Sequence, residues 1–149
     1  MEFAIRRATR DDLDQIIELL ADDVHGATRE RPGNPVYAEA FEEIDNDPNR
    51  LTAVVEQHNE LVGTLSLTFS RTLEYQGRRR MNIESVRVHR NHRKAGIGTE
   101  MIKWAIDEAK RRGVDVVRLT SHNDRVDAHR FYKRLGFTQS HVAMVLELA

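Results

Sequence analysis

The residues of this sequence with the clearest chemical potential lie in a glycine-rich segment at positions 93–99, Arg-Lys-Ala-Gly-Ile-Gly-Thr. Glycine allows a close backbone approach that a Cβ would block. Free N–H groups at the start of a helix, aided by the helix dipole, bind phosphate oxygens, and Arg93 and Lys94 add positive charge. The spacing is not that of a P-loop or a Rossmann fingerprint, because no Gly-Lys-Ser/Thr follows and Met101 occupies the third glycine position. The segment indicates either a phosphate-binding turn or a tight strand-to-helix turn with incidental basic residues.

Hydrophobic periodicity predicts the elements that must position this turn. Thr9 is expected to cap the first helix, whose first turn carries Asp11 and Asp12 where the helix dipole favours anions. The expected helices cover residues 10–23, 36–46, 97–112 and 126–135, and the expected strands cover residues 3–8, 51–56, 61–69, 82–89, 114–121 and 137–148. Residues 24–35 contain Gly and Pro and are expected to form a loop. The order β-α-α-β-β-β-α-β-α-β predicts an α/β (α+β) fold, and we expect one domain over residues 1–149.

Composition excludes several kinds of chemistry. The chain of 149 residues has no cysteine, which excludes disulfides, thiolate zinc sites, iron–sulfur clusters and a cysteine nucleophile. The seven histidines show no metal-binding spacing, so no metal site is predicted. A net charge of -1 gives no overall attraction to nucleic acid or anionic lipid, and no apolar run approaches the roughly 20 residues that span a bilayer. We expect a cytoplasmic protein with no nucleic-acid or membrane partner.

Three motifs are similar to those of one enzyme family. Residues 93–98 match the pattern Q/R-x-x-G-x-G/A, residues 83–89 resemble the strand that precedes it, and residues 128–137 match A-x-x-F-Y-x-x-L-G-F. With these motifs the chain resembles the GCN5-related N-acetyltransferases (GNAT). Residues 127–132, followed by residues 139–141, are similar to small-molecule members of the family that act on aminoalkylphosphonates, and similar runs occur in enzymes that act on amino acids or toxins. The resemblance implies a GNAT fold, a mixed central sheet of about six to seven strands with about four helices, splayed at the acetyl-CoA site.

The same resemblance implies roles for particular residues. The pyrophosphate of acetyl-CoA would bind the glycine turn, and the pantetheine arm would pair with the strand before it. Tyr132 would be the general acid that protonates the departing CoA thiolate. Arg125 stands where many relatives have a cofactor-contacting Asn, so Asn123 substitutes for it, or Arg125 reaches a CoA phosphate or an anionic substrate, or Arg125 is simply solvated. The implied cofactor-binding residues are Val86, Arg87, Val88, Arg93, Lys94, Ala95, Gly96, Ile97, Gly98, Thr99, Asn123 and Tyr132.

Glu84 is the second candidate for catalysis. Strand periodicity places Asn82 and Glu84 on one face, which carries the catalytic groups in family members that use a base on this strand. Glu84 would take a proton from the incoming ammonium through water, because an amine must be neutral to attack a thioester. The alternatives are that Glu84 recognises a cationic substrate or pairs with one of the arginines at 78–80.

We expect an acyltransferase that moves an acetyl group from acetyl-CoA directly onto a primary amine of a small molecule. The absence of cysteine favours direct transfer over a ping-pong route. Acetylation of a protein N-terminus or lysine remains an alternative, as does a non-catalytic acyl-CoA-binding regulatory module. The acceptor pocket is expected between the first two helices and residues 71–80. The apolar segment 142–148 would be an aggregation-prone strand edge unless it is covered. A homodimer is implied by the family resemblance rather than by a sequence pattern.

Overall fold

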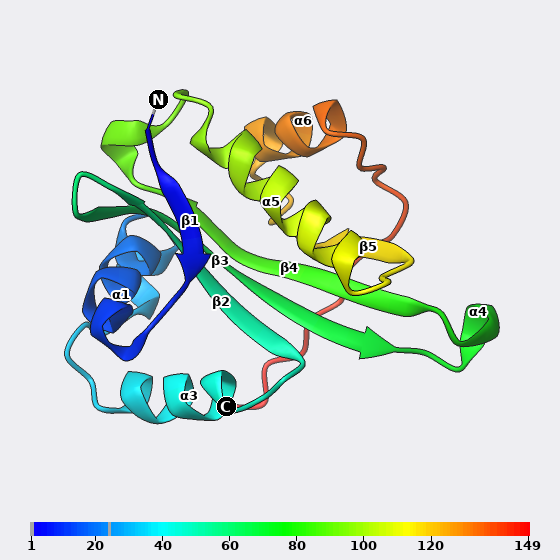
Figure 1. The fold of residues 1–149 in the computed structure, drawn as a ribbon, viewed down its shortest axis with the longest axis horizontal. Coiled ribbons are helices and arrows are strands. Elements are labelled where there is room, and N and C mark those ends of the chain that lie inside the picture. Colours follow the sequence, from blue (N-terminus) through cyan, green and yellow to red (C-terminus); the bar gives the residue numbers. More distant parts are fainter. Residues whose placement is uncertain (1, 24) are drawn as a thin grey trace. The chain divides into compact units, whose positions relative to one another are not determined.

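The computed structural model describes residues 2–23 and 25–149, and the chain divides into two compact units, Met1–Arg118 and Leu119–Ala149 (Figure 1). The second unit contains α6 (Val126–Arg134). The first unit contains β1 (Ala4–Arg7), a 3-10 turn (Arg10–Asp12), α1 (Leu13–Ala21), α2 (Gly26–Arg29), α3 (Val36–Asp45), β2 (Arg50–Gln57), β3 (Glu60–Arg71), α4 (Glu74–Gly77), β4 (Arg79–Val88), a second 3-10 turn (Arg90–His92), α5 (Ile97–Arg111) and most of β5 (Val116–Leu119). None of the helices in the described part of the chain combines the length and apolar character that crossing a bilayer requires.

A mixed five-stranded sheet in the order β1-β2-β3-β4-β5 organises the first unit. Successive strands from β1 to β4 pair antiparallel. Helices α1 and α3 pack on one face of the sheet, and α5 packs on the other (Figure 1). Each face therefore has its own cover, and the strand residues alternate between the two layers.

The face under α5 forms the apolar core. On β3, Leu65 and Leu67 are each 1% exposed, whereas Ser66 and Thr68 alternate with them on the opposite face. Full burial of such a leucine stabilises the fold by roughly 1.5–3 kcal/mol. The helical spacing predicted for α5 is confirmed, since its buried residues include Met101, Ile102, Ala105 and Ala109.

A bulge interrupts β4 immediately after Glu84. Glu84 pairs with Ser66 of β3 and Arg87 pairs with Thr64, so residues 85 and 86 together oppose one residue of β3. Ser85 has a φ of 54°, in the left-handed region that favours glycine. A bulge of this kind bends the strand and increases its twist, so β4 runs in a different direction on either side of Ser85.

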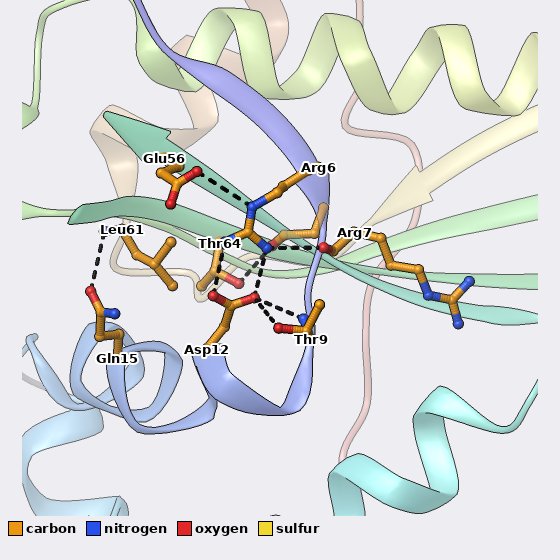
Figure 2. Close-up of polar contacts among 9 residues, drawn as sticks. Arg6, Arg7, Thr9, Asp12, Gln15, Glu56, Leu61 and Thr64 are labelled. Atoms are coloured by element: carbon orange, nitrogen blue, oxygen red, sulfur yellow. Dashed lines mark hydrogen bonds and ion pairs between the residues drawn. The ribbon is translucent and has the colours of Figure 1, made fainter. Parts of the chain in front are cut away.

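The guanidinium of Arg6 joins β1, the start of α1 and β2 (Figure 2). It donates to the Asp12 carboxylate at 2.7 and 2.9 Å, and its Nε lies 3.6 Å from a Glu56 oxygen. Thr9, predicted to cap the first helix, is the N-cap of the 3-10 turn that leads into α1. Its backbone N–H donates to the same Asp12 carboxylate at 2.7 Å. The hydrogen bonds from Arg6 hold the pKa of Asp12 below its usual 3.8, although burial opposes them.

The strand predicted at residues 137–148 is wrong. No strand forms among residues 120–149, all of which the structure describes, so the sheet has five strands rather than about six to seven. Val142, Met144 and Leu148 are 83%, 92% and 90% exposed. An apolar, β-prone segment does not form a strand unless a neighbouring strand pairs with its backbone N–H and C=O groups.

The helix predictions are confirmed with smaller corrections. The four helices of nine or more residues, α1, α3, α5 and α6, are the four that periodicity predicts. The first ends at Ala21, not at residue 23. The predicted loop at 24–35 contains the four-residue α2, and its Val24 lies outside the described residues. Such short turns lack the repeat of apolar positions on which a periodicity argument depends.

We predict that Asp12→Asn lowers the free energy of unfolding at pH 7 by about 1–3 kcal/mol, because Arg6 loses a charged partner in a site where Asp12 is 6% exposed. The folded-state pKa of Asp12 is lowered, so its contribution is complete above the unfolded-state value of 3.8 and disappears as pH falls through the folded-state value. Urea titrations between pH 7 and pH 2 should therefore give a shallower acid loss in the variant. Asp11→Asn, in the same turn but exposed, is the control and should change stability by less than about 0.5 kcal/mol. Parallel acid profiles for Asp12→Asn and the wild type would contradict this role.

Candidate active site

The glycine-rich segment forms the turn from β4 into α5, as predicted. Lys94 and Gly96 have φ values of 66° and 83°, and Gly96 is the N-cap of α5. The first intrahelical bond runs from the Glu100 N–H to the Gly96 carbonyl at 3.2 Å. Residues 97–99 therefore present N–H groups that have no acceptor within the helix, at the positive end of its dipole. This arrangement suits a phosphate oxygen.

The turn is basic, and it is anchored at both ends. Arg93 and Lys94 are exposed, and Arg93 Nε donates to the Val88 carbonyl at the end of β4 at 3.2 Å. At the other end, the Ile97 side chain is 1% exposed and packs into the core. The turn thus keeps its backbone at the surface while its two ends are fixed to β4 and to the core.

The backbone of residues 86–88 is paired on one edge. The ladder with β3 continues to Val88, which pairs with Gly63. On the other edge, β5 begins beside the start of β4, where the Asp115 N–H donates to the Arg79 carbonyl at 2.8 Å. A strand of four residues extends only about 13 Å, so β5 ends well before residue 86. Within the first unit, this splay leaves an edge of β4 on which a pantetheine amide can pair.

The side chain of Arg87 is engaged inside the protein. Its Nε lies 3.0 Å from the Asp23 carboxylate, and both side chains are 14% exposed. Its Nη1 also donates to the Val86 carbonyl at 2.9 Å. The predicted cofactor contact of Arg87 therefore depends on its backbone.

A cavity of about 250 Å³ lies between the sheet and helices α1 and α3. The helices contribute apolar side chains to its lining, among them Leu13, Ile17 and Phe41. The strands contribute polar side chains, among them Arg50, Ser66 and Glu84. The two helices expected to form an acceptor pocket do line this cavity, whereas residues 71–80 do not. An apolar cavity with a few polar groups is typical of a small-molecule site.

Glu84 faces this cavity from β4. Glu84 pairs with Ser66 and Asn82 with Thr68, so Asn82 and Glu84 share one face, as predicted, although Asn82 does not line the cavity. Among the described residues, no ion pair or hydrogen bond engages the Glu84 side chain, so it does not pair with the arginines at 78–80. The carboxylate is free to act on a ligand.

Sequence reasoning missed the polar residues of β2 and β3 that line the cavity. They are Arg50, Thr52, Ser66 and Thr68. The signal was present in the alternation of these residues with apolar ones, which marks a polar sheet face. A polar face on a strand is usually solvated, and only the position of α1 and α3 makes this one the floor of a cavity.

Tyr132 and Asn123 belong to the second unit. Tyr132 lies on α6 and packs edge to face against Phe131 and Phe137, with ring centroids 5.2 and 5.9 Å apart. Arg125 is the N-cap residue of α6. The structure thus confirms the helix that carries Tyr132, while the roles of Tyr132, Asn123 and Arg125 stay predictions.

The residues of the first unit fit an acyl-CoA. The turn at 93–99 offers free N–H groups and two cations for phosphates, and β4 offers an open backbone edge for amides. Both features lie within residues 86–99, and Glu84 precedes them on β4. A thioester bound along this edge would place its acyl group toward the Glu84 end of the strand.

Comparisons with known proteins define the class and the family. The family model described as "Acetyltransferase (GNAT) family" matches residues 13–137. The chain is 28% identical over 137 residues to the aminoalkylphosphonate N-acetyltransferase of Salmonella typhimurium, across 92% of this chain and 86% of that protein. It is 30% identical over 141 residues to an uncharacterised N-acetyltransferase of Methanocaldococcus jannaschii, across 94% of this chain and 62% of that protein. The chain is therefore an acyltransferase, and acetyl-CoA is the donor that the family implies. It belongs to the acetyltransferase (GNAT) family.

Solved structures agree on the fold. A crystal structure of a transcriptional regulator from Bacillus halodurans matches with a TM-score of 0.95 and 43% identity, across 99% of this chain and 100% of that one. Glucosamine-6-phosphate N-acetyltransferase from Arabidopsis thaliana matches with a TM-score of 0.82 across the full length of both chains. At 21% identity, the second likeness shows the fold alone.

We predict that Gly96→Val weakens acetyl-CoA binding, because a Cβ blocks the approach of the pyrophosphate and valine disfavours a φ of 83°. Titration calorimetry should show at least a roughly tenfold higher Kd for acetyl-CoA. Gly113→Val is a matched control: Gly113 has a φ of 71° just after the other end of α5, and nothing lies within 4 Å of its ideal Cβ. That control should lose similar stability and keep its affinity. Equal acetyl-CoA affinity in Gly96→Val and Gly113→Val would remove the turn from the cofactor site.

Proposed function

We propose that this protein transfers an acetyl group from acetyl-CoA directly to the primary amine of a small molecule. The observation that carries the proposal is the course of β4. Glu84 faces a cavity of about 250 Å³, and two residues later the same strand begins the open edge at residues 86–88. An acceptor in the cavity and a donor on the edge would meet at the bulge.

The proposed chemistry divides two proton transfers between two side chains. Glu84 takes a proton from the acceptor ammonium through water, which frees the nitrogen lone pair. The C–N bond forms, the C–S bond breaks, and the Tyr132 hydroxyl gives its proton to the departing sulfur. The second nitrogen proton then restores Tyr132. Acetyl-CoA supplies the acetyl group and a good leaving group, and no step needs a covalent acyl-enzyme or a metal ion.

The size of the cavity favours a small-molecule acceptor over a protein. Drug-sized ligands occupy pockets of roughly 300–1,000 Å³, so a cavity of about 250 Å³ suits a metabolite of modest size. Its walls come from two helices and the sheet. The activity that names the Salmonella relative, acetylation of aminoalkylphosphonates, supports this class of acceptor.

We also propose that the two units form one acetyltransferase domain in the cytoplasm. The family match runs from residue 13 to residue 137 and so includes both units, which supports a single domain. The absence of cysteine is compatible with a reducing compartment.

The function is tested by following free thiol release from acetyl-CoA with a panel of acceptors. The panel contains aminoalkylphosphonates, amino acids, simple alkylamines and peptides with a free N-terminus or lysine. Turnover with small amines above the rate of acetyl-CoA hydrolysis supports the proposal. Turnover with peptides alone would establish a protein acetyltransferase instead. Acetyl-CoA binding without turnover on any acceptor would contradict the proposal and favour a regulatory module.

We predict that Tyr132→Phe lowers kcat by roughly 10- to 1,000-fold, with water as a partial replacement for the proton donor. The phenyl ring keeps the packing against Phe131 and Phe137, so acetyl-CoA affinity and thermal stability should stay near wild type. Steady-state kinetics and calorimetry on the same preparation separate the two effects. An unchanged kcat would remove Tyr132 from the mechanism.

We further propose that the C-terminal segment mediates a homodimer. Its apolar side chains are between 81% and 92% exposed, namely Val142, Met144, Val145, Leu146 and Leu148. Pairing with a second copy would cover them and supply a strand partner. Light scattering at micromolar concentration should give a dimer for the wild type and for the control Glu147→Gln, and a monomer for Leu146→Asp. A monomeric wild-type protein would contradict this assembly.

A further inference from the structure

The acceptor cavity contains two opposite charges, at different places in its lining. Arg50 begins β2 and Glu84 lies on β4, and they are the only charged residues among those that line the cavity in the described structure. Among the described residues, no hydrogen bond or ion pair engages either charged group. Arg50 is also partly buried.

The sheet register keeps these two charges apart. Arg50 pairs with Thr68, and Glu84 pairs with Ser66, so the two residues are two strands apart and displaced by one two-residue step. Standard strand spacings give a Cα separation of roughly 12 Å. The side chains can therefore reach toward the two ends of one small molecule, and in the described structure they form no ion pair with each other.

The rest of the lining suits the middle of such a molecule. Leu13 and Ile17 of α1 and Phe41 of α3 cover the cavity from the helix side. These apolar walls suit the hydrocarbon part of a bound ligand. The arrangement matches a ligand with a cation at one end, an anion at the other and a short apolar chain between them.

We propose that Arg50 is the specificity-determining residue of the acceptor site, and that the acceptor is an amine that also carries an anionic group, either a carboxylate or a phosphonate. This inference rests on the proposed function, and Glu84 receives the ammonium end as described above. Arg50 binds the anionic end through its guanidinium fork, which presents paired N–H donors to two oxygens. Thr68 is the cross-strand partner of Arg50 and also lines the cavity, and its hydroxyl is a further donor for a tetrahedral anion.

The test compares three acceptors of similar size with wild-type enzyme and variants. They are 2-aminoethylphosphonate, 3-aminopropanoate and 3-aminopropanamide, in which an uncharged amide replaces the anionic group. We expect the wild type to prefer at least one anionic acceptor over the amide in kcat/KM by about tenfold or more. Arg50→Gln should lower kcat/KM for that acceptor by about 10- to 100-fold, mainly through KM, and leave the amide and the KM for acetyl-CoA unchanged. Arg50→Lys should restore part of the loss, and the comparison of the two anions shows which one the site takes.

Arg80 provides the matched control. Strand periodicity places Arg80 on the same sheet face as Glu84, and its buried Nε has no hydrogen-bond partner among the described residues, yet it does not line the cavity. Arg80→Gln should keep the preference for the anionic acceptor. If Arg80→Gln removes the preference and Arg50→Gln does not, the assignment to Arg50 is wrong.

Binding measurements separate recognition from a structural effect. Titration calorimetry with 2-aminoethylphosphonate and 3-aminopropanoate in the presence of CoA should show weaker binding to Arg50→Gln, at an unchanged thermal midpoint. An equal loss of kcat/KM for the two anionic acceptors and for the amide would assign Arg50 a structural role and overturn the inference. A wild type that acetylates 3-aminopropanamide as well as the anions would also overturn it, while leaving the proposed function intact. Absence of turnover with every amine would instead contradict the proposed function.

Discussion

The bulge at Ser85 is the constraint on which the geometry of the candidate site depends. A continuous ladder would keep β4 aligned with its neighbouring strands along its whole length. Its side chains, from Arg79 to Val88, would then alternate between the two faces of the sheet. The left-handed residue at 85 breaks that alternation and bends the strand. Glu84, before the bulge, lies on the sheet face under α1 and α3, while residues 86–88, after it, keep their ladder with β3 and are open on their other edge. One strand can therefore serve two ligands.

The two faces of the sheet divide the physical work. The face under α5 buries leucine, isoleucine and methionine and contributes to the hydrophobic stabilisation. That layer tolerates few changes because it is close-packed. The opposite face is mixed: Val54 and Phe41 join a buried cluster near β1, whereas Ser66, Thr68 and Glu84 line a cavity. Because buried apolar clusters lie on both faces, the polar floor of the cavity can be devoted to recognition.

Local signals predicted part of this arrangement and missed the part that depends on tertiary packing. Thr9 as a cap and the turn at Gly96 follow from residue type and position, and both are observed. Ser85 carries no such signal, because serine at a left-handed bulge is identified only from the register of two strands. Arg50 looks like an ordinary solvated residue until α1 and α3 cover it. The error at 137–148 has the same origin, since a strand requires a partner as well as a pattern.

Two ion pairs connect the end of α1 to the end of β4. Asp22, the C-cap of α1, pairs with Arg90 just after β4, and the next residue, Asp23, pairs with Arg87 on the strand itself. The hydrogen bond from Arg90 lowers the pKa of Asp22 below its ordinary value, although desolvation opposes the shift. Helix α1 forms a wall of the acceptor cavity, and residues 86–88 form the open edge proposed for the donor. The two ion pairs therefore couple the position of α1 to that of residues 86–90.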